Sequence, residues 1–149
     1  MTCTFFGHAD APPEVKIKLK ETVTALIENR GADRFYVGNH GNFDKMALAV
    51  LKELSTVYPH IDYCVVYAYF PQDSPRDCED FLHTVYPEGI ETVPKRFAIN
   101  YRNKWMICHS DIVITFVRNT FGNAAKFKKT AEKLDKEIIE IQECTEKVY

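Results

Sequence analysis

Hydrophobic positions recur at helical spacing in two early segments of the chain. The first stripe predicts an amphipathic helix that ends at Gly31, and the second predicts a helix that is closed before Pro59. A glycine or proline at the end of each stripe is typical of a helix stop. The two stripes consist of Val15, Leu19, Val23, Leu26 and Ile27, and of Phe43, Met46, Ala47, Val50, Leu51 and Leu54.

Short runs of β-branched and aromatic residues alternate with these helices. The run 63–69 is almost continuously apolar, as expected for a parallel strand that is covered on both faces. Strands that alternate with helices predict an α/β protein with right-handed crossovers, and specifically a Rossmann-like, doubly wound, mainly parallel five-stranded sheet with helices on both faces. The expected strands are 3–6, 34–37, 63–69, 112–116 and 137–141, and the expected later helices are 95–109 and 124–135.

A long segment interrupts this alternation. From about residue 70 to residue 94, prolines and acidic residues are scattered without a clear period, which predicts a loop excursion with a short helix near 77–83. A loop of this length is typically a lid or a disordered segment. The chain of 149 residues is otherwise the size of one domain, so we expect a single domain over 1–149.

The composition and motifs count against several classes of binding partner. The 19 Lys and Arg nearly balance the 21 Asp and Glu, so no global positive field favours duplex nucleic acid. The first residues do not resemble a secretory signal, and no apolar stretch is long enough to span a bilayer, so we expect a cytoplasmic protein without a membrane partner. The five cysteines never form CxxC, and no HExxH is present, so we expect neither a metal nor a cofactor.

Small and polar residues follow the predicted strands. In open α/β sheets ligands bind beyond the carboxyl ends of the strands, so these segments are candidates for a binding site. The segment 38–44 has two glycines before a helix, which allows backbone N–H groups and the helix dipole to face a phosphate or carboxylate. The candidates at the strand ends are Gly7, His8, Gly38, Asn39, Gly41, Asn42, Phe43, Arg118, Gly122, Asn123, Ala124 and Lys126.

Several of these candidates also have a purely structural interpretation. Gly38 and Gly41 do not have the spacing of a GxGxxG or P-loop motif, so they fit a tight turn with Asn42 as the helix cap. His8 fits a ligand contact or a turn residue, and Lys126 fits an anion contact or a solvated helix position. No catalytic residue is assigned.

Several stretches resemble a known family. The segment 101–112, with Arg102 and Met106 ahead of Ser110 and Asp111, resembles the LOG proteins, which are cytokinin riboside phosphate phosphoribohydrolases. In those proteins an Arg-Lys-x-x-Met helix leads to Ser-Asp, an apolar strand and Pro-Gly-Gly-x-Gly-Thr. Together with 5–8 and 36–39, the chain is similar over nearly its whole length to the SLOG superfamily, named for the LOG and Smf/DprA proteins, in a branch of small bacterial and phage proteins.

The resemblance implies roles for some residues and also shows departures. Arg102 stands in the place of the LOG arginine, where a guanidinium suits a phosphate or ribose, and residues 122–124 stand in the phosphate-cradling turn. The glutamate that LOG enzymes use for hydrolysis has no counterpart in 121–127, which carries a lysine instead. Ala9 stands where this branch favours arginine, and Asn123 stands where a second glycine is common.

Three functions follow from the resemblance as expectations. The first is a homo-oligomeric binding protein that senses or sequesters a nucleotide-derived small molecule, such as a cyclic ADP-ribose or another NAD-derived signal of phage defence. The second is a nucleoside monophosphate phosphoribohydrolase-like enzyme that cleaves the N-glycosidic bond, with Asp44 or Glu91 as the general acid or base. The third is single-stranded nucleic-acid binding, by analogy with DprA, against which the near-neutral charge counts.

Overall fold

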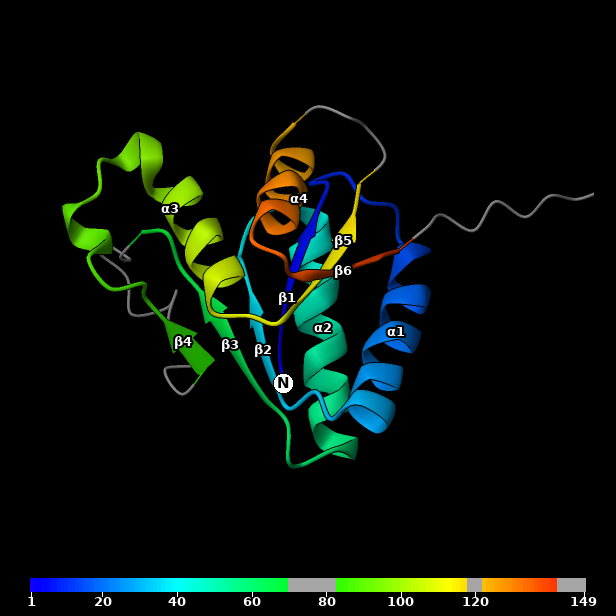
Figure 1. Ribbon diagram of the computed structural model, residues 1–149. Helices are drawn as coiled ribbons and strands as arrows, with labels where there is room; N and C mark the ends of the chain where they lie inside the picture. Colours follow the sequence, from blue (N-terminus) through cyan, green and yellow to red (C-terminus); the bar gives the residue numbers. More distant parts are fainter. Residues whose placement is uncertain (70–82, 118–121, 142–149) are drawn as a thin grey trace, which may run out of the picture.

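A computed structural model describes residues 1–69, 83–117 and 122–141 of the chain. In these ranges it contains a six-stranded, all-parallel sheet and four α-helices (Figure 1), and it therefore has the predicted α/β class. The strands are β1 Thr2–Gly7, β2 Arg34–Val37, β3 Asp62–Val66, β4 Thr84–Val85, β5 Ile112–Phe116 and β6 Glu137–Glu140. The helices are α1 Val15–Arg30, α2 Gly41–Val57, α3 Lys95–Cys108 and α4 Asn123–Lys133, and a 3-10 turn, η3, spans Ile90–Thr92.

The strand order is β4-β3-β2-β1-β5-β6. From β1 the chain moves outward through β2, β3 and β4, and then returns to β5 on the opposite side of β1. This order is consistent with a Rossmann-like fold, in which the direction of winding changes between two neighbouring central strands. The change falls between β1 and β5, and their carboxyl ends therefore flank a crevice.

Two hydrophobic clusters cover the two faces of the sheet. Successive residues of a strand point to opposite faces, so Phe5 packs with the α1 and α2 side and Phe6 packs with the α3 and α4 side. Leu19 and Leu51 are fully buried on the first side, and Met106 is 1% exposed on the second. The helical stripes of the sequence are therefore core positions, as predicted.

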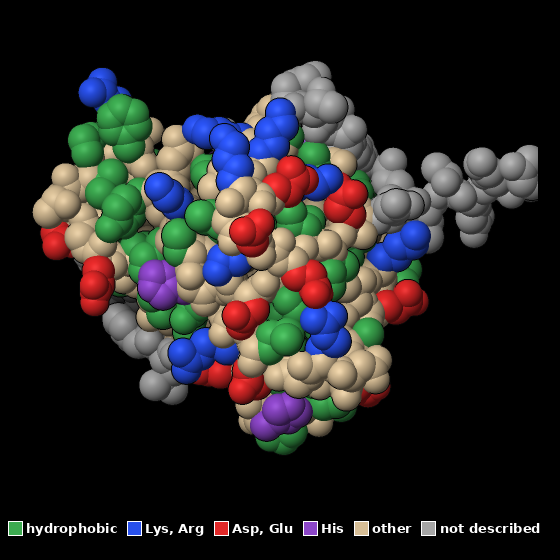
Figure 2. All heavy atoms as spheres, viewed as in Figure 1, with side chains coloured by type: hydrophobic (Ala, Val, Ile, Leu, Met, Phe, Trp, Pro, Cys, Tyr) green, Lys and Arg blue, Asp and Glu red, His purple; other side chains and the backbone are tan. Residues whose placement is uncertain are grey.

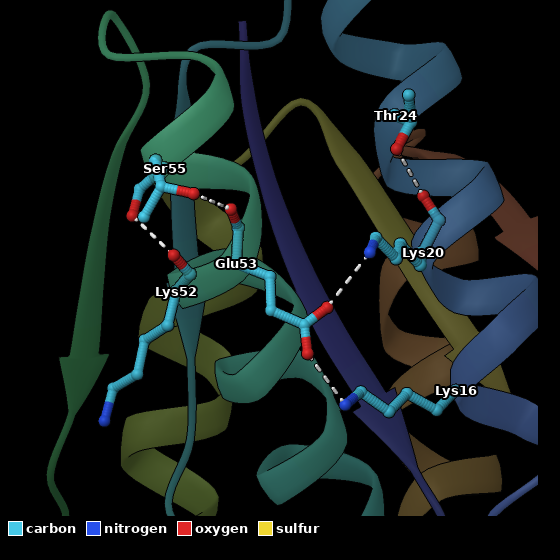
Figure 3. A network of polar contacts seen from close by, with 7 residues as sticks. Lys16, Lys20, Thr24, Lys52, Glu53 and Ser55 are labelled. Atoms are coloured by element: carbon cyan, nitrogen blue, oxygen red, sulfur yellow. Dashed lines mark hydrogen bonds and ion pairs between the residues drawn. The ribbon is translucent and has the colours of Figure 1, made fainter.

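α1 ends at a glycine, as the sequence predicts, and charged side chains connect it to α2. Gly31 has a φ of 71°, and its N–H donates to the Leu26 carbonyl, so the predicted glycine stop is confirmed. On the outer side, the carboxylate of Glu53 lies between Lys16 at 3.0 Å and Lys20 at 3.1 Å (Figure 3). These side chains are exposed, so their pairing orients the two helices more than it stabilises them.

The prediction of five strands was wrong, because the described part of the sheet has six. The additional strand, β4, has only two residues and lies inside the segment 70–94 that was predicted to be a loop. It pairs with β3 through Val65 opposite Thr84 and Val66 opposite Val85. Two residues are too few to show the alternation by which strands are recognised. Of the short helix predicted near 77–83, residues 77–82 lie outside the described residues.

The other boundaries differ by a few residues. The third strand was predicted to continue to residue 69 but ends at Val66. α3 and α4 end one and two residues before their predicted limits of 109 and 135. Within the described ranges, no helix is both long and apolar enough to cross a membrane.

Candidate functional site

A cavity of about 60 Å³ opens beyond the carboxyl end of β1, on the side of the sheet covered by α3 and α4. It adjoins the crevice that the strand order predicts for a ligand. Its walls come from β1, the beginning of α2, the middle of α3 and the first turns of α4. The lining residues are Phe5, Phe6, Gly7, His40, Asp44, Ile99, Arg102, Asn103, Met106, Ala124 and Phe127.

Arg102 is the principal cation of this cavity. Its side chain belongs to α3 and is only 3% exposed. Its Nε donates to the Asn103 side-chain oxygen at 3.1 Å, and its Nη1 donates to the Asn39 side-chain oxygen at 2.7 Å. No carboxylate of the described residues forms an ion pair with it. The guanidinium therefore has neutral amides as its hydrogen-bond partners and no direct ionic partner among the described residues.

Burial shapes the electrostatics of Arg102. Burial lowers the pKa of the guanidinium from its usual value, while the nearby Asp44 and Tyr69 act in the opposite direction. An arginine nevertheless stays protonated at neutral pH. The cavity thus contains a permanent, buried positive charge.

Asp44 brings a carboxyl group to the same cavity from the first turn of α2. It is 9% exposed, and its Oδ2 accepts the backbone N–H of His40 at 3.0 Å. Burial raises the pKa of Asp44 to about 6, against the opposing effects of the His40 N–H and the charge of Arg102. This carboxyl group can therefore change its protonation state close to neutral pH, as a general acid or base must.

The absence of a side chain at Gly38 allows Arg102 and Asp44 to lie close to the end of β2. A Cβ atom at this position would lie 2.7 Å from Asp44 Oδ2 and 3.3 Å from Arg102 Cζ. Any side chain larger than hydrogen would therefore displace the carboxylate. The prediction that Gly38 serves a close approach fits this geometry, although here the neighbours are side chains of the protein itself.

The beginning of α2 is already partly occupied by the loop after β1. The N–H of Asn42 donates to the Ala9 carbonyl at 2.8 Å, so it is not free to bind an anion. Gly41 has a φ of +88°, and a Cβ atom there would lie 2.6 Å from the Ala9 Cα. The positive φ of Gly41 supports its structural interpretation, but the prediction of Asn42 as the helix cap was wrong, because His40 is the N-cap and Asn42 lies in the first turn of α2.

Phe43 and Gly7 form a packing pair next to the cavity. A Cβ atom on Gly7 would lie 2.3 Å from the Phe43 ring, and this ring stacks on Phe116 with centroids 6.2 Å apart. Phe43 is 1% exposed and belongs to the α1 and α2 side of the core, while Gly7 also lines the cavity. Phe43 therefore packs behind Gly7 in the core and does not line the cavity.

Of the remaining predicted residues, only some line the cavity. Ala124 lines it, whereas Gly122 and Lys126 are exposed. His8 is half-buried and is not a lining residue; its N–H donates to the Phe116 carbonyl at 3.3 Å, which joins the ends of β1 and β5. Arg118 and the side chain of Asn123 lie outside the described residues.

Sequence reasoning missed most of the contribution of α3. Ile99, Asn103 and Met106 line the cavity with Arg102, at the spacing of one helical face. That spacing was visible around Arg102 and could have identified them. Within the described ranges, no group of three or more His, Cys, Asp or Glu lies close enough to hold a metal ion.

The fold and the site together define a Rossmann-like α/β protein with a charged cavity where the winding of the sheet changes. No protein-family model matches the chain, and no curated protein is similar to it in sequence.

Proposed function

We propose that this protein binds a nucleotide-derived small molecule and holds a phosphate of that molecule beside Arg102, as a sensor or a sequestering protein. The observation that carries the proposal is a guanidinium that is 3% exposed and has neutral amides as its hydrogen-bond partners. The Asp44 carboxyl lies nearby and acts on the guanidinium electrostatically, but it forms no direct ion pair with it. A ligand phosphate would supply a direct ionic contact, with the bidentate geometry that arginine favours.

The size of the cavity agrees with this assignment. A volume of about 60 Å³ equals roughly two water molecules at about 30 Å³ each, so it suits a small group such as a phosphate and is too small for a whole nucleotide. The remainder of the ligand must therefore extend over the rim. α4, which lines the cavity with Ala124 and Phe127, also carries Lys126, Lys128, Lys129 and Lys133, of which Lys128 is paired with Glu140. Figure 2 shows Lys and Arg side chains over this part of the surface. Such a field attracts anionic ligands.

Asp44 favours a second candidate function, hydrolysis of an N-glycosidic bond. It lines the same cavity as Arg102, and its pKa of about 6 suits proton transfer. Glu91, the other carboxylate considered for this role, lines a different cavity. If the protein is an enzyme of this class, Asp44 is therefore the general acid or base. The SLOG resemblance is compatible with both functions.

The first experiment is a thermal-shift screen with adenine and guanine nucleotides, NAD, ADP-ribose and its cyclic forms, followed by chromatography of each stabilising compound. Recovery of the compound unchanged supports the sensor or sequestering protein, and recovery of a free base supports the hydrolase. If none of the nucleotides stabilises the protein, the proposed function is wrong.

The Arg102→Ala variant tests the site itself. Loss of a charge-assisted contact should weaken the binding of a phosphorylated compound by about 10- to 100-fold. The melting temperature should change little, because the variant also removes a buried cation. Arg96→Ala is the matched control, since Arg96 is exposed on the same helix with its guanidinium 4.8 Å from the Phe97 ring centroid. Equal affinity of Arg102→Ala and wild type would exclude Arg102 from the site.

A further inference from the structure

A second cavity, of about 220 Å³, lies beside the beginning of α3. It is larger than the cavity at Arg102 and mostly apolar in its walls. Two charged residues, Glu91 and Lys95, stand at its edge. The lining residues are Ala68, Tyr69, Ile90, Glu91, Val93, Lys95 and Ala98.

The two cavities are neighbours along α3. Ala98 lines the second cavity and the next residue, Ile99, lines the first. Ile99 also packs against the apolar cluster of Ala68, Ile90 and Ala98, which are all lining residues of the second cavity. Tyr69 lines the second cavity and is close enough to Arg102 to influence its electrostatics. Ile99 therefore borders both spaces, lining the first and packing against the walls of the second.

The chemistry of the second cavity suits a planar heteroaromatic ring. Ile90 and Ala98 form apolar walls, and the Tyr69 hydroxyl donates to the Lys95 carbonyl at 3.2 Å, which fixes the tyrosine across the start of the helix. Tyr69 is nevertheless 44% exposed, so part of its ring is accessible to a stacking partner. Glu91 can accept hydrogen bonds from an amino group, and Lys95 can donate to a ring nitrogen or carbonyl. Every nucleobase has a π-face and such polar edges.

Exposed aromatic side chains follow the start of α3, next to this cavity. Phe97 and Tyr101 on α3 are 48% and 38% exposed, and Figure 2 shows hydrophobic side chains at the beginning of α3. The two cavity volumes together approach the lower end, about 300 Å³, of the range for small-molecule sites.

We propose that the second cavity is the base compartment of the same site and holds the nucleobase of the ligand whose phosphate lies beside Arg102. This inference rests on the proposed function, because it assumes that Arg102 binds a phosphate. It adds that the protein recognises the base as well as the phosphate, with Tyr69 as the stacking residue.

The test compares AMP with ribose 5-phosphate, which has the same phosphate and sugar but no base, by isothermal titration calorimetry. The wild type should bind AMP at least about tenfold more tightly. In Val93→Trp a large side chain fills the second cavity, so AMP should lose this advantage while ribose 5-phosphate binds as before. Val57→Trp, at an exposed position near the end of α2, is the matched control and should keep the wild-type ratio.

The outcomes separate the two proposals. If ribose 5-phosphate binds as tightly as AMP, the base compartment is wrong while the phosphate site stands. If the preference for AMP survives in Val93→Trp, the base lies elsewhere and the inference is again wrong. If neither compound binds, the proposed function fails and the inference fails with it. Should Val93→Trp not fold, Tyr69→Ala serves instead, since Tyr69 is partly exposed and its removal should lower the preference for AMP in the same way.

Discussion

Replacement of Asp44 by Asn should make the protein more stable at neutral pH. The carboxylate lies at the candidate site, 9% exposed, and its pKa is raised from 3.8 to about 6, chiefly by burial. The charged form is thus disfavoured in the folded state, even with the His40 N–H at 3.0 Å and Arg102 nearby. Asparagine has the same shape, keeps an oxygen that can accept the His40 N–H, and carries no charge.

The size and sign of the effect follow from this shift. Between about pH 4 and pH 6 the folded state holds a proton that the unfolded state has released, so the contribution of Asp44 to stability falls as the pH rises through this window. Above pH 6 the loss is complete and amounts to about 3 kcal/mol. Asp44→Asn should recover up to this amount at pH 7, or roughly 6–12 °C in melting temperature. Near pH 4 the variant and the wild type should be almost equal.

Urea denaturation of both proteins at pH 4.5, 5.5 and 7 measures the difference directly. The advantage of Asp44→Asn should grow with pH and then level off above about pH 6. Asp10→Asn, at an exposed position, is the control and should show no comparable trend. If Asp44→Asn is no more stable than the wild type at pH 7, the carboxylate is not penalised by burial, and its assignment as an acid or base loses its physical basis.

Two further predictions concern the close approach at β2 and the burial of β1. Gly38→Ala should destabilise the protein by about 1–3 kcal/mol and abolish AMP binding, because its Cβ would lie 2.7 Å from Asp44 Oδ2. Gly31→Ala is the control, because φ is +71° there but no atom lies within 4 Å of the added Cβ. It should cost about 1 kcal/mol of stability and leave AMP binding intact. If both variants bind AMP equally well, the contact between a Gly38 side chain and Asp44 does not matter for binding. Burial raises the pKa of Cys3 to about 12, so iodoacetamide should label the exposed Cys108 and spare Cys3 in the folded protein. Mass spectrometry of the labelled peptides decides this, and labelling of Cys3 without denaturant would show that β1 is not buried as described.

The framework of the fold was predictable because its signals are local and repeated. The stripe that includes Leu19 and the stripe that includes Leu51 give the two helices of one face, and the run 112–116 gives a central strand. β4 was not predictable in this way. Its two residues become a strand only because β3 offers unpaired backbone groups at Val65 and Val66. Such a strand depends on tertiary pairing, which leaves little trace in local sequence.

The candidate site was predictable only in part, for a related reason. The end of a strand pointed to Gly38, and the SLOG resemblance pointed to Arg102. The two residues lie next to each other, because a Cβ atom on Gly38 would be 3.3 Å from Arg102 Cζ. Asp44 entered only as an alternative carboxylate, because its significance lies in burial, which a sequence does not display. His8 follows a strand directly, yet its ring lies edge-on to Phe116 with centroids 6.0 Å apart and does not line the cavity.

The edge strand β6 limits how this protein can associate with itself. The strand begins and ends with a glutamate. The guanidinium of Arg30 on α1 donates two hydrogen bonds of 3.0 Å to the Glu137 carboxylate, and Lys128 of α4 pairs with Glu140. Charged residues along an outer strand oppose its pairing with a strand of another molecule, and β4 on the far side offers only two residues. Within the described residues, neither edge of the sheet is therefore well suited to a continuous intermolecular sheet, which leaves the helical surfaces as the more suitable contact for any homo-oligomer.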